Sequence, residues 1–148
     1  MRINDVLRAG HVKRWHTVHV LREQSIAEHM WNVAMIADTI FLKLGLNVDV
    51  YTAMTHDLSE VRGGDIPSHQ KSAAPYSSFS DEQIVIKGAD LIDAEWFMLN
   101  YRGPGSHAQE VFKDVQQRLD NFIIDCPENI GEAVMKVRAE VMDPRHEL

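Results

Sequence analysis

The sequence predicts an all-α protein, a single helical bundle of about five to seven helices that spans residues 1–148 as one domain. Apolar residues recur at the helical period in successive segments of the chain. Serine and asparagine stand where helix N-caps are expected, and glycine stands where several helices should end. No segment has the strict apolar–polar alternation of a strand, and none is repeated or low in complexity.

Residues 1–10 are expected to form a short helix that ends at Gly10. Residues 11–24 follow as an irregular or partly helical segment, rich in polar side chains but carrying the large aromatic Trp15. This segment can be interpreted in two ways. It is either a surface stretch anchored by Trp15, or a phosphate and sugar contact supplied by Arg14 with Trp15 as an apolar wall.

The next helix should run over residues 25–44. Ser25 and Glu28 fit the capping box, in which each side chain satisfies a free backbone amide of the other residue. Apolar residues recur at the helical period through the segment, and Gly45 stands where a left-handed cap is expected.

Asn47 can cap a helix over residues 48–61, which should stop at the glycine pair Gly63–Gly64. Residues 62–80 are the only long stretch without a helical period. Loops of this length in a compact domain usually have a function, so we expect a lid or a pocket wall there.

A second capping box, Ser80 with Gln83, should open a helix over residues 81–100. After a break at glycine and proline, Ser106 is expected to cap one further helix, and Pro127 precedes the last. These two helices carry no cluster of chemical side chains and are expected to be scaffold.

Composition excludes several classes of protein. A chain of 148 residues with 45% hydrophobic content can bury one core but is too short for two, and no apolar run is long enough to cross a membrane. The N-terminus lacks the apolar run of a signal peptide, so we expect a cytoplasmic protein. The net charge of −7 argues against broad binding to nucleic acid. With Cys126 as the single cysteine, any metal ligands must be histidines and carboxylates.

His56 and Asp57 are adjacent, and Glu60 follows within one helical turn. They place two types of metal ligand and a candidate general base together. The alternative is a solvated helix end, because adjacent histidine and aspartate often occur by chance.

Two further helices carry candidate ligands. His29 lies at the apolar period of its helix and should point inward, either as a hydrogen-bonded core residue or as a metal ligand. Asp90 lies on the apolar side of the helix predicted over residues 81–100, where an unpaired carboxylate is uncommon. Periodicity alone does not separate Asp90 from Asp93 and Glu95.

These motifs, taken in order, resemble those of the HD-domain phosphohydrolases. The resemblance covers residues 11–90; within the superfamily the chain is similar to the bacterial 5′-deoxynucleotidases and, more closely, to the small bacteriophage dATP triphosphohydrolases. It rests on Arg14–Trp15, His29 after a glutamate, His56–Asp57 with Glu60, Gly64–Asp65–Ile66–Pro67 and Lys87–Gly88–Ala89–Asp90.

The resemblance implies a role for each matching residue. The metal ligands would be His29, His56, Asp57 and Asp90, which selects Asp90 over Asp93. His56, Asp57 and Glu60 would form the catalytic set, with Glu60 as the acid/base for the attacking water. The substrate contacts would be Arg14 at the α-phosphate, Trp15 against the deoxyribose or base, Asp65 near the sugar and Lys71 with Lys87 at the outer phosphates. Thr17 is a further candidate for contact with the base.

The expected reaction is the conversion of dATP to deoxyadenosine and triphosphate, in which metal-activated water attacks the α-phosphate. The cofactor would be one divalent transition metal such as zinc, cobalt or manganese, with magnesium accompanying the triphosphate. Alternatives are a 5′-deoxynucleotidase that acts on monophosphates and a non-catalytic nucleotide-binding protein. We expect a homo-oligomer in the cytoplasm, the host's if a phage encodes it, with no nucleic-acid polymer or membrane as partner.

Overall fold

The structure, a computed structural model, describes residues 2–47, 49–59 and 76–143. Within these ranges the chain forms six α-helices and two short 3-10 helices, and it forms no β-strand there, so the predicted all-α class and number of helices are confirmed. In chain order the elements are α1 (Ile3–Arg8), η1 (Ala9–His11), α2 (Ile26–Lys43), α3 (Val50–Thr55), η3 (Tyr76–Ser78), α5 (Asp81–Tyr101), α6 (Ser106–Asp125) and α7 (Glu128–Met142).

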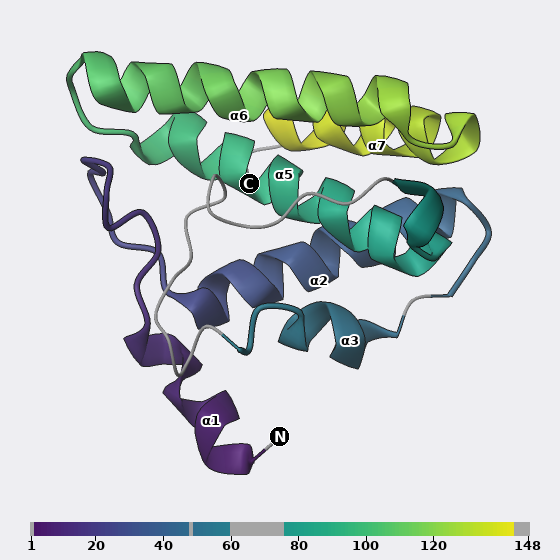
Figure 1. Cartoon of the computed structure of the whole chain (residues 1–148), viewed down its shortest axis with the longest axis horizontal. Helices are drawn as coiled ribbons and strands as arrows, with labels where there is room; N and C mark the ends of the chain where they lie inside the picture. The colour runs from purple at the N-terminus through teal and green to yellow at the C-terminus, as the bar shows by residue number, and fades with distance from the viewer. Residues whose placement is uncertain (1, 48, 60–75, 144–148) are drawn as a thin grey trace.

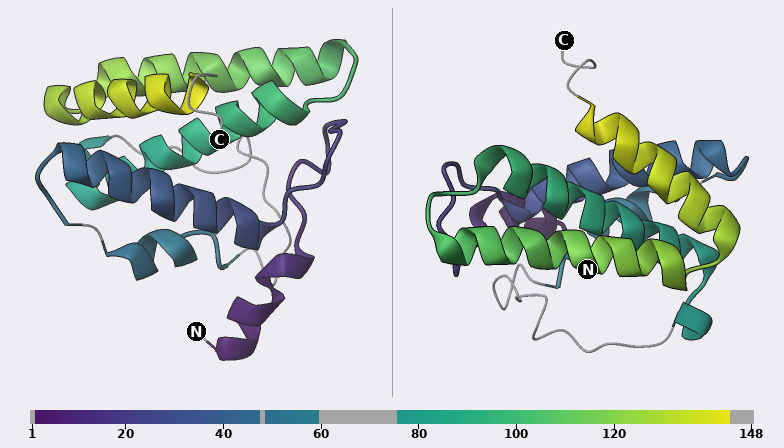
Figure 2. Two further views of the ribbon diagram at one scale, coloured as in Figure 1. Left: turned by 180° about the vertical axis from the view of Figure 1, so that it is seen from behind. Right: turned by 90° about the horizontal axis from the view of Figure 1, so that it is seen from above.

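Helix α5 lies at the centre of the bundle. Helices α6 and α7 pack on one side of α5, α2 packs on the other, and α3 lies against α2 (Figure 1). Seen from above, α7 runs at an oblique angle to α6, and in the view from behind α1 projects from the rest of the bundle (Figure 2). The core between the helices is apolar and fully enclosed, with Ile92 of α5, Leu119 and Phe122 of α6 and Val134 of α7 among its buried side chains.

The caps of α2 and α5 follow the sequence closely. Ser25 accepts a hydrogen bond from the backbone N–H of Glu28, but the Glu28 carboxylate does not return to the cap. It accepts instead from the guanidinium of Arg22 at 2.7 and 3.0 Å, so this capping box is only half formed. At α5 both halves of the capping box of Ser80 and Gln83 are present.

Two other helix starts differ from the prediction. Asp49, not Asn47, is the N-cap of α3, because its carboxylate accepts from the backbone N–H groups of Tyr51 and Thr52. Gly105 is the N-cap of α6, and Ser106 is the first helical residue. Gly105 has a φ of +113°, which side-chain-bearing residues rarely adopt, so the chain turns there and not one residue later.

Helix α3 is also shorter than the predicted 48–61. It ends at Thr55, and residues 56–59 form a turn. The predicted lid over 62–80 lies largely outside the described residues, and η3 is its described end.

Residues 12–26 form a loop that folds back on itself. Its two arms pair through Arg14 N–H to the carbonyl of Gln24 and Ile26 N–H to the carbonyl of Val12, both at 2.8 Å. Its tip is tied to the end of α5, where Leu21 N–H donates to the carbonyl of Tyr101 at 2.7 Å. The predicted irregular segment is therefore a hairpin-like loop, and it holds Arg14 next to Gln24.

None of the helices in the described ranges is both long and apolar enough to cross a membrane.

Candidate metal centre

Four side chains of the predicted ligand set converge on one point. His29 comes from α2, Asp90 comes from α5, and His56 and Asp57 come from the turn after α3. One donor atom from each lies within 4.8 Å of the other three. His29 Nε2 is 2.9 Å from Asp90 Oδ1 and 3.3 Å from Asp57 Oδ2, and His56 Nε2 is 3.3 Å from that same Asp57 oxygen.

Packing on α2 brings the turn of residues 56–59 to His29. Leu58, in the middle of this turn, is buried in a small apolar cluster with Ile26 and Met30 of α2. Because His29 lies between those two residues in sequence, the side chain that fixes the turn also brings Asp57 to the imidazole. The alternative of a solvated helix end is excluded for His56 and Asp57, whose side chains are only 16% and 12% exposed.

Each imidazole uses Nδ1 for support and turns Nε2 toward the cluster. His56 Nδ1 lies 2.7 Å from the carbonyl oxygen of Ala53, and His29 Nδ1 lies 2.6 Å from Asp93 Oδ2. The Ala53 carbonyl only accepts, so His56 Nδ1 carries a hydrogen and donates it. His29 Nδ1 also donates, because the accepting Asp93 oxygen is closer to it than Arg14 Nη1, which lies at 2.9 Å. The two Nε2 atoms are buried and face carboxylate oxygens of Asp57 and Asp90, which is the arrangement of a metal-binding histidine.

The charges around His29 shift its pKa. Burial and the nearby Arg14 guanidinium lower it, but hydrogen bonds with Asp57, Asp90 and Asp93 outweigh them and raise the pKa of His29 to about 10. Burial alone would raise the pKa of Asp90, yet its hydrogen bond to His29 and the charges of His29 and Arg14 hold that pKa well below its usual range. The cluster therefore carries negative charge that attracts a cation.

Two imidazole nitrogens and two carboxylate oxygens fit a divalent transition metal. Donor atoms lie about 2.0–2.2 Å from zinc, so two donors on one ion can be at most about 4.4 Å apart. The spacing of the four donors, within 4.8 Å, is close to that limit, and the two buried Nε2 atoms face the carboxylates across it. Zinc, cobalt and manganese all accept mixed nitrogen and oxygen ligands.

A further carboxylate, Asp93 of α5, supports the cluster from the Nδ1 side of His29. It is fully buried and accepts from His29 Nδ1, from Gln24 Nε2 at 3.0 Å and from Asn32 Nδ2 at 2.8 Å. Asp90 and Asp93 thus hold opposite edges of one imidazole. The third rival, Glu95, is buried in a two-pronged ion pair with Arg138 of α7, which is scaffold.

The sequence did not indicate Gln24 or Asn32. Asn32 follows His29 by three positions and so shares its helix face, which is a weak signal in hindsight. Gln24 stands before the helix in an irregular segment, where no periodicity applies.

The predicted substrate contacts are only partly close to the metal cluster. Arg14 is nearby: its side chain is 13% exposed, and Nη1 lies 2.9 Å from His29 Nδ1. Trp15 adjoins Arg14, whose guanidinium lies 5.0 Å from the Trp15 ring. Lys87 is exposed on α5 one turn before Asp90, and Thr17 is exposed on the loop of residues 12–26. Glu60, Asp65 and Lys71 lie outside the described residues.

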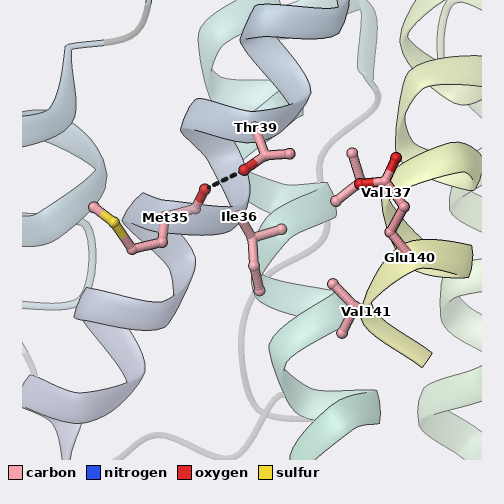
Figure 3. A pocket seen from close by; sticks show the side chains of 6 residues that line it. All are labelled: Met35, Ile36, Thr39, Val137, Glu140 and Val141. Carbon is pink, nitrogen blue, oxygen red and sulfur yellow. Dashed lines mark hydrogen bonds between the residues drawn. The ribbon is translucent and has the colours of Figure 1, made fainter. Parts of the chain in front are cut away.

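A separate groove of about 350 Å³ lies between α2 and α7, away from this cluster (Figure 3). None of the four predicted ligands lines it. Its lining is mostly apolar: Met35, Ile36, Thr39, Val137, Glu140 and Val141. The metal cluster, and not this groove, is therefore the site with chemical groups.

Comparison with known proteins connects the chain to a characterised group. The family model described as HD domain matches residues 6–89. A dATP triphosphohydrolase of Cyanophage S-2L is 37% identical over 147 residues, covering 80% of this chain and 83% of that protein. A dATP triphosphohydrolase of Salmonella phage PMBT28 is 26% identical over 149 residues, covering 80% and 76%. A 5′-deoxynucleotidase of Shewanella oneidensis is 31% identical over 68 residues, which is 40% of this chain and 35% of that protein.

The fold has a counterpart among solved structures. A Cyanophage S-2L HD phosphohydrolase, bound to dA and one catalytic Zn²⁺ ion, superposes with a TM-score of 0.80. It is 22% identical, and the match covers 95% of this chain and 96% of that one.

Proposed function

The chain belongs to the HD-domain family, and we propose that it is a metal-dependent phosphohydrolase that converts dATP to deoxyadenosine and inorganic triphosphate. One observation carries the proposal: two buried imidazole Nε2 atoms and two carboxylates face a single point. Relatives that cover most of the chain are named for this reaction, which supports dATP as the substrate.

The proposed roles divide between the ion and the protein. His29, His56, Asp57 and Asp90 would hold one divalent ion, for which zinc, cobalt and manganese are candidates. When bound, such an ion lowers the pKa of a coordinated water and neutralises charge that develops on the α-phosphate. Magnesium would accompany the triphosphate.

Side chains around the ligand cluster would bind and orient the nucleotide. Arg14, partly exposed beside His29, would bind the α-phosphate. Within the described residues, the polar contacts of the Arg14 side chain all use Nη1. Trp15 would lie against the deoxyribose or base, with Thr17 as a further base contact. Lys87 would meet the outer phosphates, together with Lys71 from the sequence.

Glu60 is the proposed acid/base, on the basis of the sequence resemblance. Replacing Glu60 with alanine should leave metal and nucleotide affinity intact while kcat falls by about a hundredfold or more, the usual range of general acid/base effects. Single-turnover kinetics together with metal analysis of the purified variant checks this. Unchanged kcat would remove Glu60 from the role.

The alternative is a 5′-deoxynucleotidase, favoured by the partial match to the Shewanella enzyme. Incubating the protein with dATP or dAMP and separating the products by chromatography decides between them. The proposal expects deoxyadenosine and triphosphate from dATP. Free phosphate from dAMP with no triphosphate from dATP would overturn it.

A triphosphate site should also depend on the outer cations. Lys87→Ala should raise the KM for dATP by roughly tenfold, about the contribution of one hydrogen bond to a charged group, with little change in kcat. A steady-state comparison with Lys136→Ala, an exposed lysine on α7, supplies the control.

We further propose that the chain functions as one domain over residues 1–148, as a homo-oligomer in the cytoplasm of a host cell. The phage origin of two relatives supports this location. Light scattering of the purified protein tests the assembly.

A further inference from the structure

The side chain of Gln24 forms three hydrogen bonds from a fully buried position. Its Oε1 accepts from Arg14 Nη1 at 2.7 Å and from Trp15 Nε1 at 2.9 Å. Its Nε2 donates to Asp93 Oδ2 at 3.0 Å. The orientation of the amide follows from these neighbours, because Arg14 and Trp15 can only donate and the Asp93 carboxylate accepts.

The third bond connects Gln24 to the metal cluster. Asp93 also accepts the Nδ1 hydrogen of His29, at 2.6 Å. The Gln24 amide therefore joins Arg14 and Trp15 to the carboxylate that orients a predicted metal ligand, and Arg14 Nη1 also lies 3.5 Å from that carboxylate directly. Partners that orient a ligating imidazole in this way influence both its position and the affinity for the ion.

The backbone of Trp15 gives an independent reason to expect a positioning device here. Trp15 has a φ of +62°, in the left-handed region that bulky residues rarely occupy. Its ring stacks on Phe97 of α5, with centroids 5.9 Å apart and planes 4° from parallel. A strained conformation persists only where its surroundings fix it, and the bond to Gln24 together with this stacking does so.

We propose that Gln24 is a positioning residue, which holds Arg14 and Trp15 at a fixed place relative to His29. The effect of Gln24 on nucleotide binding rests on the proposed function, since that function puts Arg14 and Trp15 against the nucleotide. The hydrogen bonds of Gln24 do not depend on the proposed function. Gln24 itself need not touch the nucleotide, because it acts through its two donors.

The hydrogen bond between the Trp15 indole and Gln24 can be tested on the zinc-loaded wild-type protein by NMR. The three tryptophans give three indole N–H signals, which Trp→Phe variants assign. Trp15 should exchange its indole hydrogen with solvent far more slowly than Trp31, which is 55% exposed. Equal exchange for Trp15 and Trp31 would overturn the proposal, and this measurement requires no variant at Gln24.

Two substitutions at Gln24 extend the test. Gln24→Met keeps the length of the side chain but removes the shared acceptor, so Trp15 indole exchange should speed up by about tenfold or more. Gln24→Glu keeps an acceptor oxygen for both donors but replaces the donor to Asp93 with an oxygen, so Trp15 exchange should be slower than in Gln24→Met. A slow Trp15 signal in Gln24→Met would contradict the role assigned to this bond.

Kinetics distinguish positioning from general support of the fold. In Gln24→Met the KM for dATP should rise by about tenfold to a hundredfold, the range for a lost hydrogen bond to a charged group, and kcat should fall less. Zinc affinity, measured with a competing chelator, should also weaken. Glu95→Gln is the matched control, because it disturbs a buried polar contact to Arg138 away from the cluster and should leave KM unchanged.

The outcomes separate the two proposals. An equal rise of KM in Glu95→Gln and Gln24→Met would show general loosening and overturn the positioning role. If the wild-type protein does not hydrolyse dATP, the proposed function fails, while the indole exchange and the zinc affinity still decide the role of Gln24.

Discussion

His29 connects the candidate metal centre to its supporting network. Its Nε2 faces Asp57 and Asp90, and its Nδ1 donates to Asp93. With a pKa of about 10, the metal-free imidazole is protonated on both nitrogens at neutral pH. An ion that binds at Nε2 must displace one of these protons, whereas the hydrogen on Nδ1 stays with Asp93.

Metal binding is therefore expected to release about one proton at pH 7–9. Affinity for zinc should rise by about tenfold per pH unit across this range, because each unit lowers the proton competition tenfold. Calorimetry in two buffers of different ionisation enthalpy measures the released proton. An affinity that is constant from pH 7 to pH 9 would contradict the protonated state of His29.

The same pKa makes the stability of the metal-free protein depend on pH. The pKa of His29 is raised from 6.5 to about 10, so its contribution to stability is complete below pH 6.5. This contribution is lost as the pH rises to about 10. As the pH rises from 7 to 9, the affinity for zinc should thus rise while the stability of the metal-free protein falls.

The limits of sequence reasoning are clearest at these residues. The inward direction of His29 followed from the helical period, and the structure confirms it. The period could not separate Asp90 from Asp93, because both lie on the face of α5 that meets His29 and each contacts a different nitrogen. Family resemblance was needed to assign the ligand. Gln24 was missed because its contacts depend on how a non-periodic loop folds.

Among the elements, α5 carries both a predicted metal ligand, Asp90, and a close helix contact at Gly88. A Cβ atom added at Gly88 would lie 2.9 Å from the ring of Phe122 in α6 and 3.1 Å from Val134 in α7. Such distances are shorter than normal contacts, and both neighbours are held in the core. Gly88 therefore allows α6 and α7 to approach α5 closely.

Gly88→Val should destabilise the fold by about 1–3 kcal/mol, the usual cost of overpacking a core. The slightly better helix propensity of valine offsets only a few tenths of this. Urea unfolding measures the difference. Gly10→Val is the control, because nothing lies within 4 Å of a Cβ at Gly10, and equal losses in both variants would contradict the packing argument.

The long helices were predictable because their apolar period and caps agree, as at α2 and α5. The short α3 was predicted too long. The predicted helix included His56 and Asp57, but in the structure these residues lie in a turn held by Ala53, Leu58 and the ligand cluster. Tertiary contacts therefore override the local helical pattern.

At the scale of the whole molecule, the four predicted ligands join three separate parts of the chain: α2, the turn after α3, and α5. In the unfolded chain these parts are far apart, so an ion should bind the folded state almost exclusively. Metal binding then adds to the stability of the entire bundle.

Removal of the metal with a chelator should lower Tm by roughly 5–10 °C relative to protein with zinc at a hundred times its Kd, which corresponds to about 2.7 kcal/mol. Differential scanning calorimetry measures the shift. Asp57→Ala should bind zinc weakly and show little shift between the two conditions. A full shift in this variant would contradict the ligand assignment.

The left-handed backbone of Trp15 has a consequence for protein engineering. A glycine at this position would relieve the strain, but it would also remove the stacking on Phe97 and the hydrogen bond to Gln24, so the strain is retained in exchange for these contacts. Under the proposed function, losing the indole would also remove a wall of the nucleotide site, so one unusual backbone conformation serves both the packing on Phe97 and the proposed binding of substrate.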